Sequence, residues 1–194
     1  MLQDPIQTVD YHLAPEAVRR DIAVLLHRVW PEVSPLPDEM IPDAHEPGWI
    51  VQSFYAYAGG HLVSYAGVVQ KTIAHHGETF HIAGLSCVAT DPDYRGQGWG
   101  FRTVRAATAW METQHSIDFG IFTCHPSLAD FYARAGTWEV VPDVTLIGSR
   151  DEGALSSQTL PVVVLMRLFS RKALPCRSLR HTTVDLHVPV GQFL

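Results

Sequence analysis

A glycine-rich turn at residues 91–100, DPDYRGQGWG, most constrains what this chain can fold into. It follows an apolar run at 85–89, which predicts a buried strand, and precedes residues 101–114, whose pattern predicts a helix. A strand, a glycine-rich turn and a helix N-terminus together bind anions, because unpaired backbone N–H groups and the positive end of the helix dipole point the same way. Arg95 adds a permanent charge that can pair with phosphate. The segment therefore predicts an α/β fold with a phosphate-binding turn.

The spacing within this turn narrows the choice of phosphate ligand. A P-loop requires Gly-Lys-Ser/Thr at the end of the turn, where this chain has Gly98-Trp99-Gly100, and the third glycine of a dinucleotide fingerprint is missing. The remaining pattern, Arg-x-x-Gly-x-Gly, resembles the pyrophosphate loop of GNAT-family acyltransferases, which bind coenzyme A; a turn that only joins strand to helix is the alternative. The resemblance implies acetyl-CoA contacts from nine residues: Val88, Ala89, Thr90, Arg95, Gly96, Gln97, Gly98, Trp99 and Gly100.

A second signature follows about thirty residues later. Residues 119–124, FGIFTC, predict a short buried strand, and Pro126-Ser127 then favours a helix start. An apolar helical face follows at 128–132, and Gly136 is predicted to end this helix in a left-handed conformation. The phrase LADFYARAGTW resembles the GNAT element in which a helix tyrosine faces the thioester sulfur. The resemblance implies that Tyr132 protonates the leaving thiolate; a core aromatic is the alternative.

The remaining patterns predict one domain over residues 1–194. A helix is expected at 15–29, strands at 50–58, 62–71, 78–90, 162–169 and 182–188, and the turn between the first two strands at Gly59-Gly60. Together with the resemblance, this predicts an α/β, single-domain GNAT fold. Its mixed, mostly antiparallel central sheet is expected to be flanked by helices and splayed at the acetyl-CoA site.

The chemistry of acyl transfer suggests roles for residues of the predicted central strand. By resemblance, a backbone N–H near Val88 or Ala89, aimed by a β-bulge, binds the thioester carbonyl as negative charge develops on it. Related enzymes place a glutamate base where this chain has Ser86, and no carboxylate lies between 84 and 90. The amine proton must then leave through water, past Ser86 or His81, or to a carboxylate from another segment. The candidate catalytic residues are Tyr132, Val88 and Ser86.

Within the GNAT family, the sequence is most similar to aminoglycoside 2'-N-acetyltransferases, through residues 62–70, the Arg95 loop and 131–138. Those enzymes surround a polycationic sugar with carboxylates, and residues 32–46 are acidic here. Candidate substrate-binding residues are Asp38, Glu39, Asp43 and Thr123. A weaker resemblance to nodulation N-acyltransferases, which acylate glucosamine units, leaves another amine open. A coenzyme A-binding module without turnover is the alternative from a different class, and the missing glutamate favours it.

Charge and composition limit the partners. With 14 Lys and Arg against 20 Asp and Glu, the net charge of −6 argues against nucleic acid, including aminoacyl-tRNA, and permits a cationic small-molecule substrate. No signal peptide and no apolar run near ~18 residues is found, so no membrane partner is expected. Three cysteines without C-x-x-C spacing favour reduced thiols in the cytoplasm. Adjacent His75-His76 point to opposite faces of a strand, so we expect a solvated hairpin end and no metal. The sequence leaves open whether the protein forms a homodimer.

Overall fold

The structure is a computed structural model and describes residues 5–33 and 42–194. Its contacts define two compact units. The first unit consists of Met1–Val69 and Leu85–Thr108, and the second of Gln70–Gly84 and Ala109–Leu194. Two long strands, β3 (His61–His75) and β4 (Glu78–Thr90), contribute residues to both units. That all 194 residues form one domain stays a prediction.

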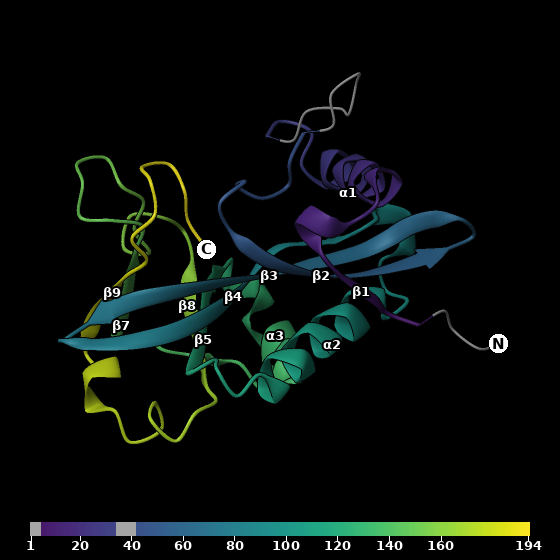
Figure 1. The fold of residues 1–194 in the computed structure, drawn as a ribbon. Coiled ribbons are helices and arrows are strands. Elements are labelled where there is room, and N and C mark those ends of the chain that lie inside the picture. Colours follow the sequence, from purple (N-terminus) through teal and green to yellow (C-terminus); the bar gives the residue numbers. More distant parts are fainter. Residues whose placement is uncertain (1–4, 34–41) are drawn as a thin grey trace. The chain divides into compact units, whose positions relative to one another are not determined.

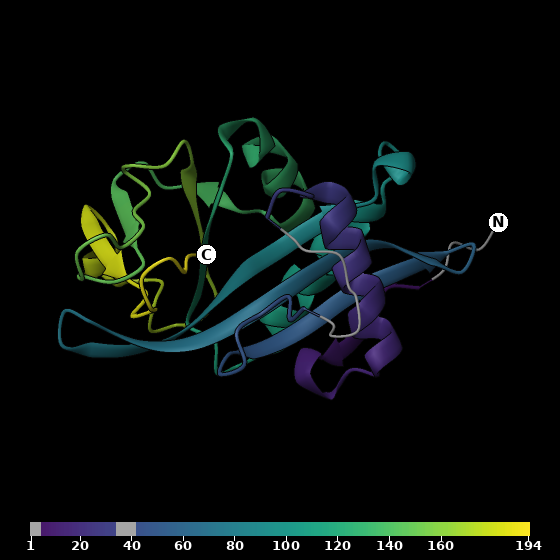
Figure 2. The ribbon, with the colours of Figure 1, turned by 90° about the horizontal axis from the view of Figure 1, so that it is seen from above.

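The first unit contains a sheet with one helix on each face (Figures 1 and 2). Its other elements are β1 (Gln7–Asp10), η1 (Tyr11–Leu13), α1 (Glu16–Val29), β2 (Ile50–Ala58), η2 (Pro92–Tyr94) and α2 (Trp99–Thr113), of which residues 109–113 belong to the second unit. The strands lie in the order β1-β2-β3-β4, and β1 pairs antiparallel with β2 from Gln7↔Tyr55 to Asp10↔Gln52. In Figure 1, α1 covers one face and α2 the other.

Local sequence accounts for these elements. Pro15 lies at the N-cap of α1, and the helix buries Ile22, Leu25 and Leu26 on one stripe. β2 and β3 are joined by Gly59-Gly60, whose φ angles of +58° and +82° suit a two-residue hairpin turn. The predicted helix 15–29 and strands 50–58 and 78–90 are confirmed within one residue.

The second unit contains the first part of β4, which pairs in parallel with the next strand along the chain. Its elements are β5 (Phe119–Cys124), η3 (Pro126–Leu128), α3 (Ala129–Gly136), β6 (Glu139–Val140), β7 (Val144–Ile147), β8 (Val163–Leu168), η4 (Arg177–Leu179) and β9 (Thr182–Asp185). β4 pairs parallel with β5 at Ile82↔Phe119 and Ala83↔Gly120, whereas β8 pairs antiparallel with β5 and β6. The seven-stranded order is β1-β2-β3-β4-β5-β8-β6, so the predicted α/β fold with a mixed, mostly antiparallel sheet flanked by helices is confirmed. The splay of the sheet stays a prediction.

An aromatic core holds α3 on β5. The Trp138 ring packs edge-on against Phe122, with centroids 4.8 Å apart, and Tyr132 packs on the same phenylalanine at 5.0 Å. Gly120 makes this possible, since a Cβ there would lie 2.6 Å from Cζ3 of Trp138. The missing side chain on β5 lets the indole lie directly on the strand.

The structure corrects several local predictions: β3 extends to His75, past the predicted 71, and β9 ends at Asp185, short of the predicted 188. Gly136 does not adopt the left-handed conformation: it is the last residue of α3 and is buried, and Thr137 has φ +54° in its place, with its N–H donating to Ala133 O. His75 does not lie at a solvated hairpin end. It is buried and its Nε2 lies 2.8 Å from Ser178 O, whereas His76 forms the turn with φ +49°.

Candidate active site

The glycine-rich loop begins from a fixed turn at the end of β4. The Asp91 N–H donates to Val63 O (2.9 Å), and Asp91 Oδ1 accepts from the N–H of Asp93 (3.0 Å). The Tyr94 N–H donates to Asp91 O at 2.9 Å and closes the short helix η2. These bonds fix the direction in which the chain enters residues 95–98.

Two glycines of the loop are required by the backbone conformation. Gly96 and Gly98 have φ of +74° and +81°, which residues with a side chain adopt at a cost. A Cβ at either position would meet no atom of the described chain within 4 Å, so the space beside both glycines is open. Gly98 O accepts the first helical bond of α2, from the N–H of Arg102. An open loop that leads into a helix N-terminus fits a diphosphate.

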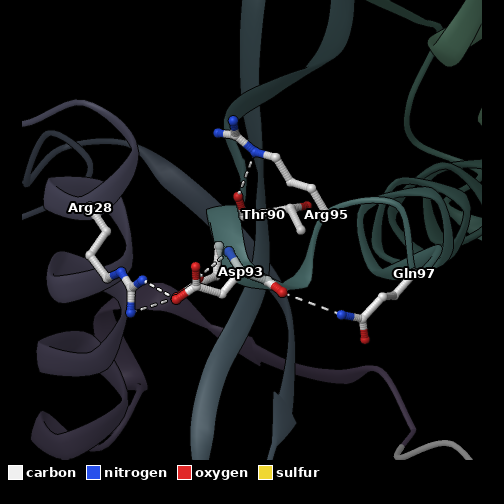
Figure 3. Close-up of polar contacts among 6 residues, drawn as sticks. Arg28, Thr90, Asp93, Arg95 and Gln97 are labelled. Atoms are coloured by element: carbon white, nitrogen blue, oxygen red, sulfur yellow. Dashed lines mark hydrogen bonds and ion pairs between the residues drawn. The ribbon is translucent and has the colours of Figure 1, made fainter.

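The polar side chains of the loop point in different directions (Figure 3). The Arg95 Nε donates to Thr90 O at 3.3 Å, so the guanidinium lies at the end of β4. The Gln97 amide instead donates to Asp93 O at 3.3 Å. The two remaining guanidinium nitrogens of Arg95 are the groups suited to a phosphate, because they form a fork of N–H donors.

Trp99 and Gly100 lie in the first turn of α2. The helix therefore begins at Trp99, two residues before its predicted start at 101. The Trp99 indole is 8% exposed and packs on Ala56 and Val63. The Arg102 guanidinium lies 4.6 Å from the centre of its ring. Because the indole lies in the core, a cofactor contact from Trp99 would come from its backbone.

Cys87 lies one residue before Val88, near the place where a β-bulge was predicted; the bulge itself stays a prediction. Cys87 has φ +52°, a left-handed conformation that interrupts the regular strand. Its thiol lies within bonding distance of Ala44 O (3.5 Å), and the Ser86 hydroxyl lies 3.7 Å from the same sulfur. Further along β4, Ala89 O accepts from the Ser64 hydroxyl at 3.2 Å, and that hydroxyl lies 3.4 Å from Thr90 Oγ1. The kink occurs where a carbonyl-binding N–H is expected.

A buried polar cluster near Ala44 was not predicted. His45 Nε2 lies 2.8 Å from the Tyr65 hydroxyl, which lies 3.1 Å from Ser53 Oγ. Burial, with a smaller contribution from His12, lowers the pKa of His45 to about 4, so the ring is neutral at pH 7. Gly67 leaves room for it, since a Cβ there would lie 2.6 Å from His45 Nε2. A histidine after an acidic stretch carries no sequence signal for this contact.

The predicted acceptor carboxylates are described in part. Asp43 Oδ1 lies 3.7 Å from Arg19 Nη1, and the side chain is 44% exposed. The following residue is anchored, because the Ala44 N–H donates to the Tyr11 hydroxyl at 2.7 Å. Asp38 and Glu39 lie outside the described residues.

In the second unit, Tyr132 has a buried ring and a protonated hydroxyl. The side chain is 6% exposed, and burial, with the nearby Cys124 thiol, raises its pKa. Thr123, the predicted acceptor contact on β5, donates from both its N–H (3.1 Å) and its hydroxyl (2.7 Å) to Leu194 O. His81, a predicted proton path, lies with Nδ1 2.9 Å from Thr72 Oγ1.

The sequence matches the model of the acetyltransferase (GNAT) family over residues 18–137, more than half of the chain. The chain belongs to the GNAT family. It is therefore an acetyl-CoA-dependent N-acetyltransferase, and the matched region contains the strand, the loop and α3 described above. No curated protein matches the sequence.

Solved structures share the fold of this GNAT protein at low sequence identity. YhbS, a GNAT N-acetyltransferase from Escherichia coli solved with CoA, is 18% identical with a TM-score of 0.59, over 95% of this chain and 91% of that one. An acyl-CoA N-acyltransferase from Pseudomonas aeruginosa is 15% identical with a TM-score of 0.57, over 84% and 97%. A putative N-acetyltransferase from Lactobacillus plantarum is 20% identical with a TM-score of 0.53, over 86% and 99%. At these identities the likeness shows the fold alone.

The described residues of the GNAT chain contain neither a group of metal ligands nor a membrane-spanning helix. Within residues 5–33 and 42–194, no three His, Cys, Asp or Glu side chains are grouped so that they could hold a metal ion. In the same part of the chain, no helix is long and apolar enough to cross a membrane.

The loop assignment predicts a loss of cofactor affinity in the Arg95→Ala/Gly98→Ala double variant. Acetyl-CoA binding should weaken at least tenfold, because one charge-assisted contact is lost at about 1.5–3 kcal/mol and the φ of +81° becomes strained. Titration calorimetry measures the affinity. Arg105→Ala, an exposed change on α2, is the matched control and should leave it unaltered. Equal affinity in the double variant would remove the loop from the cofactor site.

Proposed function

We propose that this enzyme transfers acetyl from acetyl-CoA to a primary amine of a small cationic amino sugar, with an aminoglycoside 2'-amine as the leading candidate. The supporting observation is the acidic segment at 32–46. It contains five carboxylates and no Lys or Arg, and its described end is anchored by Tyr11 at Ala44. Ala44 O lies 3.5 Å from the Cys87 thiol on β4. The next residue, Val88, has the backbone N–H that we propose donates to the thioester carbonyl. A cationic acceptor is attracted to this segment by charge.

The proposed reaction is direct attack in a ternary complex. The neutral amine attacks the thioester carbonyl, the C–N bond forms, and the backbone N–H of Val88 stabilises the oxygen as it becomes negative. The amine proton leaves through water past Ser86, which replaces the carboxylate base of related enzymes. When the C–S bond breaks, Tyr132 donates its hydroxyl proton to the thiolate. Burial of Tyr132 keeps that proton in place before the reaction.

The acceptor assignment predicts a KM effect. The Asp38→Asn/Glu39→Gln/Asp43→Asn variant should raise KM for a polyamine sugar about tenfold, with kcat nearly unchanged, because the carboxylates act in binding and not in the chemical step. Steady-state thiol release measures both constants. The control Asp151→Asn/Glu152→Gln removes exposed charges from a loop of the second unit and should leave KM unaltered. An unchanged KM in the triple variant would make the segment a solvated surface.

A second candidate is favoured by one observation. Ser86 stands where related enzymes have a glutamate, so the chain could bind coenzyme A without turnover, as a sensing or assembly module. Tyr132 argues against this candidate, because a binding module needs no acid. Nodulation-type acylation of a glucosamine unit is the alternative acceptor within the same chemistry. In each case we propose a small-molecule partner in the cytoplasm.

A further inference from the structure

Arg28 connects helix α1 to the two carboxylates at the start of the glycine-rich segment 91–100, and Figure 3 shows its contact with one of them, Asp93. It lies in the last turn of α1, 65 residues before Asp93. Its Nη2 lies 2.8 Å from Asp93 Oδ2 and its Nη1 lies 3.2 Å from Asp91 Oδ2. All three residues belong to the first unit. One guanidinium thus neutralises two carboxylates at the entrance of the loop.

The Asp91 carboxylate is needed for the shape of the loop. Its side chain is 5% exposed, and its Oδ1 accepts the N–H of Asp93 that starts η2. A buried carboxylate is costly unless it is paired and hydrogen-bonded, and Arg28 provides the pairing charge. The loop therefore contains a negative charge for structural reasons at a place where an anion is to bind.

The net charge of the segment shows why Arg28 affects the binding of an anion. Residues 90–100 contain Asp91, Asp93 and Arg95, a net charge of −1, and Arg28 brings the total to zero. The diphosphate of coenzyme A is itself anionic, so a net negative loop would repel it. Without Arg28, the positive end of α2 and the Arg95 guanidinium would be opposed by two uncompensated carboxylates.

We propose that Arg28 is a positioning residue of the coenzyme A site, which acts by cancelling the charges of Asp91 and Asp93. The residue lies outside the Arg-x-x-Gly-x-Gly pattern and acts on the diphosphate through the two carboxylates. This inference rests on the coenzyme A chemistry of the proposed function and is independent of the acceptor amine. A purely mechanical role, in which the ion pairs only fasten α1 to the loop, predicts different behaviour.

The test compares four variants by calorimetric titration with coenzyme A. Arg28→Met should weaken binding about fivefold at low salt, the effect of one uncompensated charge several ångströms away in a solvated site. Arg20→Met is the matched control, since Arg20 lies two turns earlier on α1 and pairs with Glu16 at 3.7 Å; affinity should stay within about twofold of wild type. Asp93→Asn should bind as tightly as wild type or more tightly, and Arg28→Met/Asp93→Asn should regain most of the loss.

Three results would overturn the inference. If Asp93→Asn weakens binding as much as Arg28→Met, the ion pair only fastens the loop. If Arg28→Met binds like wild type, the residue has no role in the site. The loss should also shrink in ~1 M salt, because screening reduces an electrostatic effect, and a salt-independent loss contradicts charge cancellation. If Arg28→Met does not fold, as circular dichroism would show, the Asp93→Asn affinity and its salt dependence decide.

The same titrations separate this inference from the proposed function. If the wild-type protein binds coenzyme A but acetylates no amino sugar, the acceptor assignment is wrong, and the role of Arg28 is still decided by the affinities of the variants. Wild-type protein that does not bind coenzyme A removes both. Turnover on an amino sugar with unaltered affinity in Arg28→Met removes only the inference.

Discussion

Replacing Tyr132 by Phe should lower kcat about 10²-fold and change KM for acetyl-CoA by less than about twofold. The phenol donates its proton as the C–S bond breaks, so its removal raises the free energy of the transition state and leaves acetyl-CoA binding unchanged. The ring packs edge-on against Phe122 and Phe131, and phenylalanine retains both contacts. The substitution therefore removes the hydroxyl alone. Steady-state kinetics with saturating acceptor measures the two constants.

The control for Tyr132 is a half-buried tyrosine outside the candidate site. Tyr57 on β2 donates its hydroxyl to Asp21 Oδ2 at 2.6 Å, and Tyr57→Phe should leave kcat near the wild-type value. Because burial raises the pKa of Tyr132, the hydroxyl stays protonated through neutral and mildly alkaline pH. A kcat in Tyr132→Phe equal to wild type would end the catalytic role of this residue.

Replacing Trp99 by Ala should lower the free energy of unfolding by about 3–5 kcal/mol, the usual cost of removing a buried large aromatic. The indole contacts Ala56 and Val63 in the core of the first unit, and Tyr94 of the loop packs on the same cluster. Removing it leaves a cavity at the first residue of α2. Urea denaturation measures the loss.

The control for Trp99 is Trp30, which is 37% exposed at the end of α1. Trp30→Ala should cost less than about 1 kcal/mol, because little buried area is lost. A loss below about 1 kcal/mol in Trp99→Ala would contradict the packing role. An indole that instead covers the cofactor would reduce coenzyme A affinity and leave stability unaltered.

Local patterns were enough to predict most of the fold. The strands at 50–58, 78–90 and 119–124 are bounded by turns with glycine or a polar residue, so their ends could be read from the sequence. The helix ends were harder. α2 begins at Trp99, because tertiary packing of the indole extends the helix into the glycine-rich segment. β7 was missed, since its four residues are held by parallel pairing with β9 from Val144↔Thr182.

The candidate site could be predicted only where it lies in one continuous segment. The loop at 91–100 was visible because turn glycines and a charged residue have a fixed spacing. Arg28 was not, because its contact with Asp93 joins residues 65 positions apart. His45 was missed for the same reason: it binds Tyr65 from a loop, and the glycine that admits it, Gly67, looks like an ordinary strand residue.

The most direct test of the central claim is free-thiol release from acetyl-CoA in the presence of aminoglycosides, simple amino sugars, polyamines and peptides. We expect turnover on amino sugars, fastest on an aminoglycoside with a free 2'-amine, and acetylation at that nitrogen when the product is analysed. Turnover on peptides with none on amino sugars would contradict the proposed acceptor, and coenzyme A binding without turnover on any amine would favour the binding module.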